Sequence, residues 1–110
     1  MTRVRYDERE LRMEIIGHAG FAEHGGDIVC AAASILMQTL ETALQDCADE
    51  LLPTVRKRPG EAMIYCDPEP EQERKCRDIM RTIFAGYELL ANSYPDNISA
   101  EALHSDWRGK

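Results

Sequence analysis

The sequence predicts an α+β domain in which a mainly antiparallel sheet carries two helices on one face. Two long segments have apolar residues at the three- and four-residue spacing of an amphipathic helix, and shorter segments with strand character come before and after them. The predicted order is therefore β-β-α-β-β-α-β. Because hairpins make neighbouring strands antiparallel and each helix has a single apolar side, both helices should pack on the same face of the sheet.

Two strands are predicted at the N-terminus. Polar and apolar residues alternate over Thr2–Tyr6 and again over Leu11–Gly17, and the charged segment Asp7–Glu10 between them should form a turn. His18 stands at the end of the second strand. The following segment, Ala19–Gly26, contains three glycines and is predicted to be a loop.

The first helix should follow this loop. Asp27 has the residue type of an N-cap, and Pro53 should end the helix near Leu52, because a residue before proline disfavours helical geometry. The predicted buried row consists of residues three and four positions apart, namely Ala32, Ile35, Leu36, Thr39, Leu40, Ala43, Leu44 and Cys47.

A second hairpin and a second helix come next. Thr54–Arg58 and Glu61–Cys66 are predicted strands joined by the turn dipeptide Pro59-Gly60. The helix should begin within Asp67–Pro70 and stop at Tyr94. Its predicted buried row contains Cys76, Ile79, Met80, Ile83, Phe84, Tyr87 and Leu90.

The 110 residues are assigned to one domain, because no linker or repeat divides them, and a last strand is predicted over Asn97–Leu103. The chain has no long uninterrupted apolar run and its N-terminal residues lack the apolar core of a signal peptide, so we expect no membrane span and a cytoplasmic protein with reduced cysteines. The net charge of −7 makes nucleic acid a poor partner and would attract a basic protein substrate.

The chemical signal lies in residues 17–34. Cys30 falls in the first turn of the predicted helix, where backbone N–H groups lack intrahelical acceptors and the helix dipole favours the thiolate, which is the nucleophilic form. His18 ends the preceding strand, and the loop could fold back to bring its imidazole to the thiol. The imidazole would then accept the thiol proton and later protonate the leaving amine.

Each of these residues also has a structural interpretation. A lone cysteine on a helix is usually a small buried hydrophobe, and a lone histidine is usually a hydrogen-bonded polar residue. Asp27 needs only its capping role, although its carboxylate could orient His18. His24 could replace His18 as the base, and His18, His24 and Cys30 could together surround zinc. Zinc sites usually contain close ligand pairs such as C-x-x-C, which the sequence lacks, so no metal and no other cofactor is predicted.

Residues 17–34 resemble the signature of the ribosomal-processing cysteine protease family. The resemblance rests on Gly17-His18-Ala19, on the eleven residues between His18 and Cys30, and on Gly26-Asp27-Ile28-Val29-Cys30-Ala31-Ala32 followed by Ser34. The order of the two helices and the late Tyr94-Pro95 pair also fit the family.

The resemblance implies a cysteine endopeptidase with Cys30 as nucleophile and His18 as proton acceptor, with Asp27 as a possible accessory residue. It also implies a mobile loop over the site, which contains Gly20, Gly25 and Gly26. Family members remove the N-terminal extension from the precursor of a basic bacterial large-subunit ribosomal protein, the twenty-seventh in standard naming, and form homodimers. The alternative, from the ordinary structural interpretations, is a non-catalytic ribosome-associated or scaffold protein.

Overall fold

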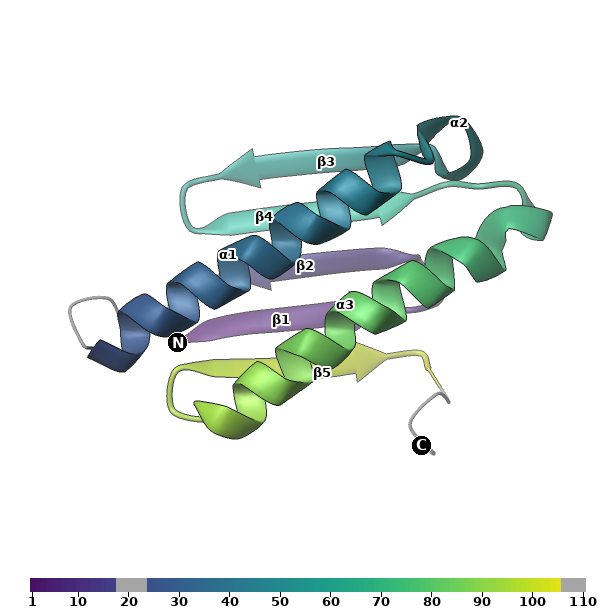
Figure 1. The fold of residues 1–110 in the computed structure, drawn as a ribbon. Coiled ribbons are helices and arrows are strands. Elements are labelled where there is room, and N and C mark those ends of the chain that lie inside the picture. Colours follow the sequence, from purple (N-terminus) through teal and green to yellow (C-terminus); the bar gives the residue numbers. More distant parts are fainter. Residues whose placement is uncertain (18–23, 106–110) are drawn as a thin grey trace.

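The structure, a computed structural model, describes residues 1–17 and 24–105, and for residues 24–27 it describes the backbone alone. This part of the chain forms one layer of strands and one layer of helices (Figure 1). The strands are β1 (Thr2–Asp7), β2 (Arg12–Ile16), β3 (Pro53–Arg58), β4 (Glu61–Cys66) and β5 (Ile98–Leu103). The helices are α1 (His24–Gln45), the short α2 (Ala48–Leu51), a single 3₁₀ turn (Pro70–Gln72) and α3 (Glu73–Ser93).

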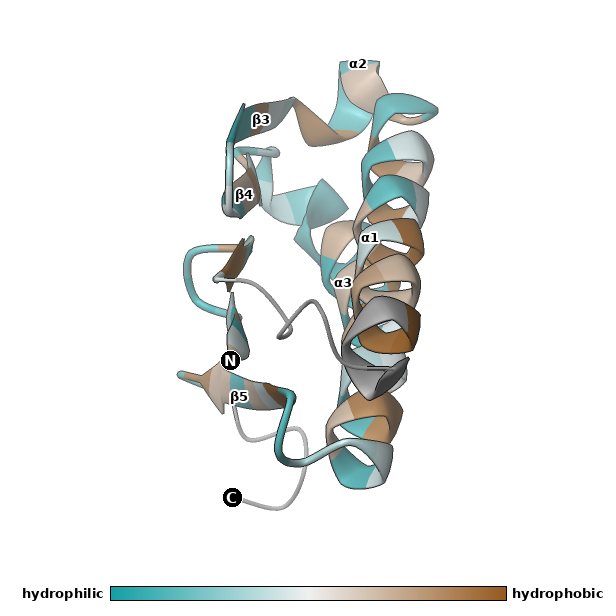
Figure 2. Cartoon of the chain, turned by 90° about the vertical axis from the view of Figure 1, so that its left-hand side faces the viewer, coloured by the Kyte–Doolittle hydropathy of each residue, from teal (hydrophilic) through white to brown (hydrophobic). Residues whose placement is uncertain are grey.

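The sheet has the strand order β3-β4-β2-β1-β5. The pairs β1–β2, β2–β4 and β3–β4 are antiparallel, whereas β5 pairs with β1 in parallel. Figure 2 shows α1 and α3 together on one side of the sheet, with no helix on the other side among the described residues. The predicted α+β class, the element order, the mainly antiparallel sheet and the single helical layer are confirmed.

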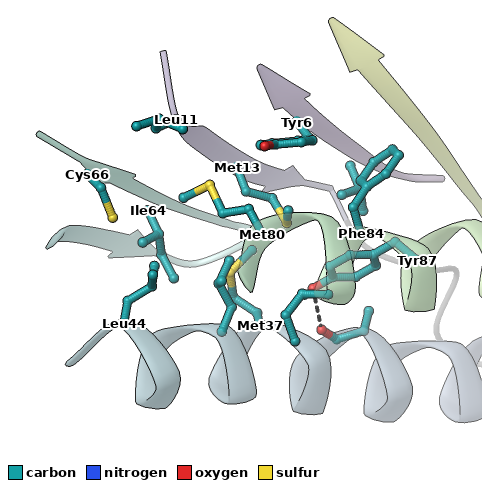
Figure 3. Close-up of a cluster of buried hydrophobic side chains, with 14 of the residues drawn as sticks. Tyr6, Leu11, Met13, Met37, Leu44, Ile64, Cys66, Met80, Phe84 and Tyr87 are labelled. Carbon is teal, nitrogen blue, oxygen red and sulfur yellow. Dashed lines mark hydrogen bonds between the residues drawn. The ribbon is translucent and has the colours of Figure 1, made fainter. Parts of the chain in front are cut away.

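The sheet has one buried face and one open face because its side chains alternate. In β1, Val4 and Tyr6 point toward the helices and are buried, whereas Arg3 and Arg5 lie on the open face and are exposed. Figure 3 shows the core between the layers, where the labelled side chains include Tyr6, Met13, Met37, Leu44, Ile64, Met80, Phe84 and Tyr87. Burial of this apolar surface is what holds the two helices on the sheet.

The buried row of α1 differs from the predicted one, which included Ile35 and Thr39, because both of these residues are exposed. Ala33 and Met37 are buried, whereas Ile35, which the spacing placed in the core, is 58% exposed. Two residues along a helix turn by roughly 200°, so Ile35 faces away from these neighbours. The side chains that are buried along α1 are Val29, Ala33, Met37, Leu40 and Leu44. In α3 the predicted Cys76, Met80, Ile83, Phe84 and Tyr87 are buried as expected.

The helix boundaries also differ from the predictions. The first helix starts at His24 and ends at Gln45, and α2 forms the last turn before Pro53. Asp27 therefore lies inside the first turn of α1 and is not its N-cap, which corrects the prediction. An acidic residue is favourable in a first turn as well as at a cap, because the helix dipole is positive there. The second long helix begins at Glu73, after the 3₁₀ turn.

One part of α1, Ile28–Gln45, is long and apolar enough to cross a membrane by length and composition. A core helix of a soluble protein passes the same test. Here the side of this segment that carries Val29, Leu40 and Leu44 packs into the core of the domain. The helix is therefore explained as part of the fold, and the absence of a membrane partner stays a prediction.

The two long helices contact each other closely one turn after Cys30. The Tyr87 hydroxyl donates a hydrogen bond of 2.8 Å to the backbone carbonyl of Ala33, as the dashed line in Figure 3 shows. Next to Tyr87, a Cβ atom on Gly86 would lie 2.7 Å from Cδ2 of Leu36, so glycine allows the helices to approach at this point. These contacts fix the position of the α1 segment that follows Cys30.

A buried ionic network lies at the C-terminal end of β1. The Arg81 guanidinium donates two hydrogen bonds to the Glu8 carboxylate, at 2.6 and 2.7 Å. Tyr6 and Ser105 each donate a hydroxyl hydrogen bond of 2.9 Å to the same carboxylate. Burial alone would raise the pKa of Glu8, but these hydrogen bonds outweigh it and lower the pKa below its ordinary value. The network joins the first turn, α3 and the residues after β5.

Candidate active site

Cys30 lines a groove of about 350 Å³ between the N-terminal half of α1 and the sheet. The thiol-bearing residue is half-buried. The wall of the groove is one side of α1, with Ala33, Ser34, Met37 and Gln38 beside Cys30. Its other lining residues come from the sheet and its turns: Thr2, Ile15, Gly17, Lys57, Arg58, Gly60, Glu61 and Ala62. The nucleophile predicted from the sequence therefore stands in a concave site that can hold part of a ligand.

The floor of the groove is a row of cross-strand neighbours. Ile15 pairs with Ala62, and Ala62 pairs with Lys57, so the row crosses β2, β4 and β3. Ile15 also pairs with the buried Val4, which places the row on the face of the sheet that the helices cover. Two of the three floor side chains are thus aliphatic, and the sheet holds them at fixed positions beneath Cys30.

Cys30 does not lie in the first turn of α1. The helix begins at His24, so Cys30 is its seventh residue and belongs to the second turn. The first four N–H groups of a helix lack intrahelical acceptors, and these are at residues 24–27. The prediction that free N–H groups surround Cys30 is therefore wrong, and the influence of the helix dipole also weakens beyond the first turn. Activation of the thiol then depends more on a nearby base.

Gly17 holds the chain at the edge of the groove, directly before His18. Its φ is +94°, and a Cβ atom at this position would lie only 2.6 Å from the carbonyl oxygen of Met1. The Gly17 N–H donates a hydrogen bond of 2.7 Å to the carbonyl of Gly60. Glycine is required here both by its backbone conformation and by the close contact. These contacts hold the end of β2 beside the groove that Cys30 lines.

The other predicted site residues fall on or beside the part of the chain that is not described. His18 and Gly20 lie outside the described residues, so the His18–Cys30 contact stays a prediction. Gly25 and Gly26 belong to the first turn of α1, although the sequence placed them in the loop. Glycine costs only about 1 kcal/mol in a helix, which the packing of the rest of α1 can offset. The alternatives that involve His24 depend on a side chain outside the description.

The charged residues of the groove are already paired. The Lys57 ammonium lies 2.6 Å from a carboxylate oxygen of Glu41 on α1, and the Arg58 guanidinium lies 2.5 Å from Glu61. The groove is therefore close to electrically neutral around its apolar floor. Sequence reasoning missed these lining residues, because they come from segments that only the fold brings next to Cys30.

The remaining cysteines have structural positions. Cys66 and Cys76 are buried. The interaction with the Cys66 thiol and burial together raise the pKa of Cys76 far above its ordinary value. Cys47 is half-buried, packs against the core and does not line the groove. Among the described residues, no group of three potential metal ligands is close enough to hold a metal ion.

Comparison with known proteins identifies the same chemistry. A family model described as "Cysteine protease Prp" matches residues 1–99. The chain is 29% identical over 98 residues to the ribosomal processing cysteine protease Prp of Bacillus subtilis (strain 168), a match that covers 84% of this chain and 86% of that protein.

Two solved structures have a similar fold. One is the essential ribosomal processing protease Prp from S. aureus in complex with a covalently linked product peptide, with a TM-score of 0.76, 23% identity, and coverage of 93% of this chain and 99% of that one. The other is SMU.848 from Streptococcus mutans, with a TM-score of 0.68, 26% identity, and coverage of 93% and 91%.

Proposed function

The chain belongs to the cysteine protease Prp family, and from that premise we propose that it removes the N-terminal extension of a bacterial large-subunit ribosomal protein, the twenty-seventh in standard naming. Membership makes the chain a cysteine-type endopeptidase and not the non-catalytic scaffold that the sequence left open. The Bacillus relative is named a ribosomal processing protease, which supports this class of substrate.

Cys30 in its groove is the observation that carries the proposal. Its sulfur would attack the carbonyl carbon of the scissile peptide bond, after His18 has accepted the thiol proton. The tetrahedral intermediate would collapse to a thioester as His18 protonates the leaving amine. Water would then add to the thioester, and the acid product would leave with the thiol restored. These steps use side chains of the protein alone, and Asp27 remains a candidate for orienting His18.

The acidic surface supports a basic substrate. The chain has a net charge of −7, and precursors of ribosomal proteins are basic, so long-range attraction would speed their association. We place this reaction in the cytoplasm, where ribosomal proteins are made and where thiols stay reduced. All four cysteines of the chain are free thiols.

The test is incubation of the purified protein with the ribosomal protein precursor, followed by mass spectrometry of the products. We expect one internal cut that releases the N-terminal extension. Cys30→Ala and His18→Ala should each abolish it, whereas Cys47→Ala, a change of another half-buried cysteine away from the groove, should retain it. Cleavage by the Cys30→Ala variant would exclude Cys30 as the nucleophile, and an intact precursor with the wild-type protein would refute the substrate.

We further propose that the protein is a homodimer and that the outer side of α1 forms the contact. Ile28 and Ile35 are 56% and 58% exposed on this side, and Ala31 between them is also exposed. No charged residue occurs from Ile28 to Ile35, the part of α1 that carries this contact, and Gln38 lies beyond it. We call Ile28, Ala31 and Ile35 the α1 strip. Contact between this apolar, uncharged strip and the same strip of a second copy would remove both from water, which is favourable.

Sedimentation at micromolar concentration tests the dimer. The wild-type chain should sediment at twice its mass of 12.5 kDa, and Ile35→Glu should sediment as a monomer. Leu89→Glu is the matched control, because Leu89 is 68% exposed on α3 and lies away from the strip. A wild-type monomer, or equal effects of the two substitutions, would exclude this interface.

A further inference from the structure

Three residues on α1 form one row along the groove. Cys30, Ser34 and Gln38 are four positions apart and all line it. Four residues rise by about 6 Å and turn by roughly 400°, so each step follows the helix axis and drifts outward by about 40°. Gln38 consequently lies about 12 Å along α1 from Cys30, at the solvent rim of the groove. Its exposure agrees with this position.

The groove offers a bound peptide two exposed, uncharged polar side chains on its α1 wall, Ser34 and Gln38. Ile15 and Ala62 form an aliphatic floor, and the charges of Lys57 and Arg58 are each engaged by a carboxylate. An extended peptide that enters such a groove loses water from its backbone N–H and C=O groups, which then need new partners. A polar side chain on the wall is the natural partner for them.

The Gln38 side chain suits that task. A carboxamide both donates and accepts hydrogen bonds, so it can pair with a peptide unit in the way another backbone amide does. Within the described part of the chain, no hydrogen bond engages this carboxamide, which leaves it available to a ligand. Its helix is held in place by the contact between Tyr87 and the Ala33 carbonyl.

We propose that Gln38 is a substrate-binding residue, which hydrogen-bonds the peptide backbone three to four residues away from the scissile bond. An extended chain rises by about 3.3 Å per residue, so the roughly 12 Å between the Cys30 and Gln38 positions corresponds to that number of residues. The inference rests on the proposed role of Cys30 and adds to it the path of the substrate along α1 toward the ion pair of Lys57 and Glu41.

Steady-state kinetics with three peptides test this contact. One peptide extends well beyond the cleavage site on both sides, and the other two are trimmed to two residues on one side or the other. With the long peptide, Gln38→Ala should raise KM about fivefold and leave kcat within about twofold, the effect of losing one hydrogen bond in binding. One of the two trimmed peptides will lack the residues that reach Gln38, and with that peptide the wild type and the variant should have equal KM values.

Gln45→Ala is the matched control, because it removes the same side chain from an exposed position at the end of α1, away from the groove. It should leave KM unchanged with every peptide. An unchanged KM for Gln38→Ala with the long peptide, or the same increase with all three peptides, would overturn the contact while leaving Cys30 as nucleophile. Failure of the wild-type protein to cleave the long peptide would overturn the proposed function and this contact with it.

Discussion

The two ends of strand β1 have opposite chemistry. At the C-terminal end, Glu8 is almost fully buried and its carboxylate accepts hydrogen bonds from Arg81, Tyr6 and Ser105. At the N-terminal end, Thr2 borders the groove of Cys30, where polar side chains such as Gln38 are exposed. One end thus uses its polar groups to hold the fold together, and the other leaves them for a ligand. Substitutions at the two ends should therefore separate stability from activity.

The largest expected effect is on turnover, at the groove end. Cys30→Ser replaces the thiol by a hydroxyl, which is far less ionised and a weaker nucleophile, so cleavage of the precursor should fall by about 1000-fold or more. The free energy of unfolding should change by less than about 1 kcal/mol, because the two side chains have nearly the same size and Cys30 is only half-buried. Cleavage assays and urea unfolding measure the two quantities, and a variant that keeps its activity would contradict the assignment.

The next largest effect is on stability, at the network end. Arg81→Met leaves the buried Glu8 carboxylate without its cation, which should destabilise the protein by about 2 to 3 kcal/mol. Arg74→Met is the control, because Arg74 is 85% exposed and its pair with Asp78, at 3.9 Å, is a surface pair worth less than about 1 kcal/mol. Equal urea midpoints for the two variants would show that the Glu8–Arg81 pair stabilises the protein no more than a surface ion pair does.

Gly17→Ala should affect both quantities, because Gly17 belongs to the sheet and also leads into His18. The new Cβ would have to occupy a left-handed conformation and approach the Met1 carbonyl to 2.6 Å, at a cost of about 1 to 3 kcal/mol. We expect kcat to fall more than KM rises, since displacement of the chain here would move His18, the proposed base. If cleavage and unfolding are both unchanged, the backbone of Gly17 does not position the site.

The smallest expected effect is the pH dependence of stability. The pKa of Glu8 is lowered in the folded protein from its ordinary value of 4.5. A lowered folded pKa means that the stabilisation is fully present above that ordinary value and is lost as the pH falls through the folded pKa. Urea unfolding at pH 7 and at a pH below 4.5 should show this loss in the wild type and less of it in Arg81→Met. If the free energy of unfolding decreases by the same amount in both proteins as the pH falls, the Glu8–Arg81 pair is not the source of the pH dependence.

Local patterns predicted most of the elements correctly, because strand alternation and helix periodicity depend on residues close in sequence. The Pro59-Gly60 turn and the β3–β4 hairpin are an example, and Gly60 has the positive φ that such a turn uses. The predicted start of α1 at Asp27 was wrong, because capping preferences allow the same residue type inside the first turn. The buried side of α1 was also misplaced, because Ile35 is as apolar as the residues that α3 and the sheet cover.

The sequence by itself determined the class of fold and, through the residues around Cys30, the protease family, and it predicts Cys30 as the nucleophile. Those conclusions need only residue types and short spacings. Only the tertiary structure decided what surrounds Cys30, because Ile15, Lys57 and Ala62 reach the groove through strand pairing. It alone also joined Glu8 to Arg81, which are 73 residues apart in the chain. Such contacts depend on how the layers pack, and no pattern of neighbouring residues encodes that packing.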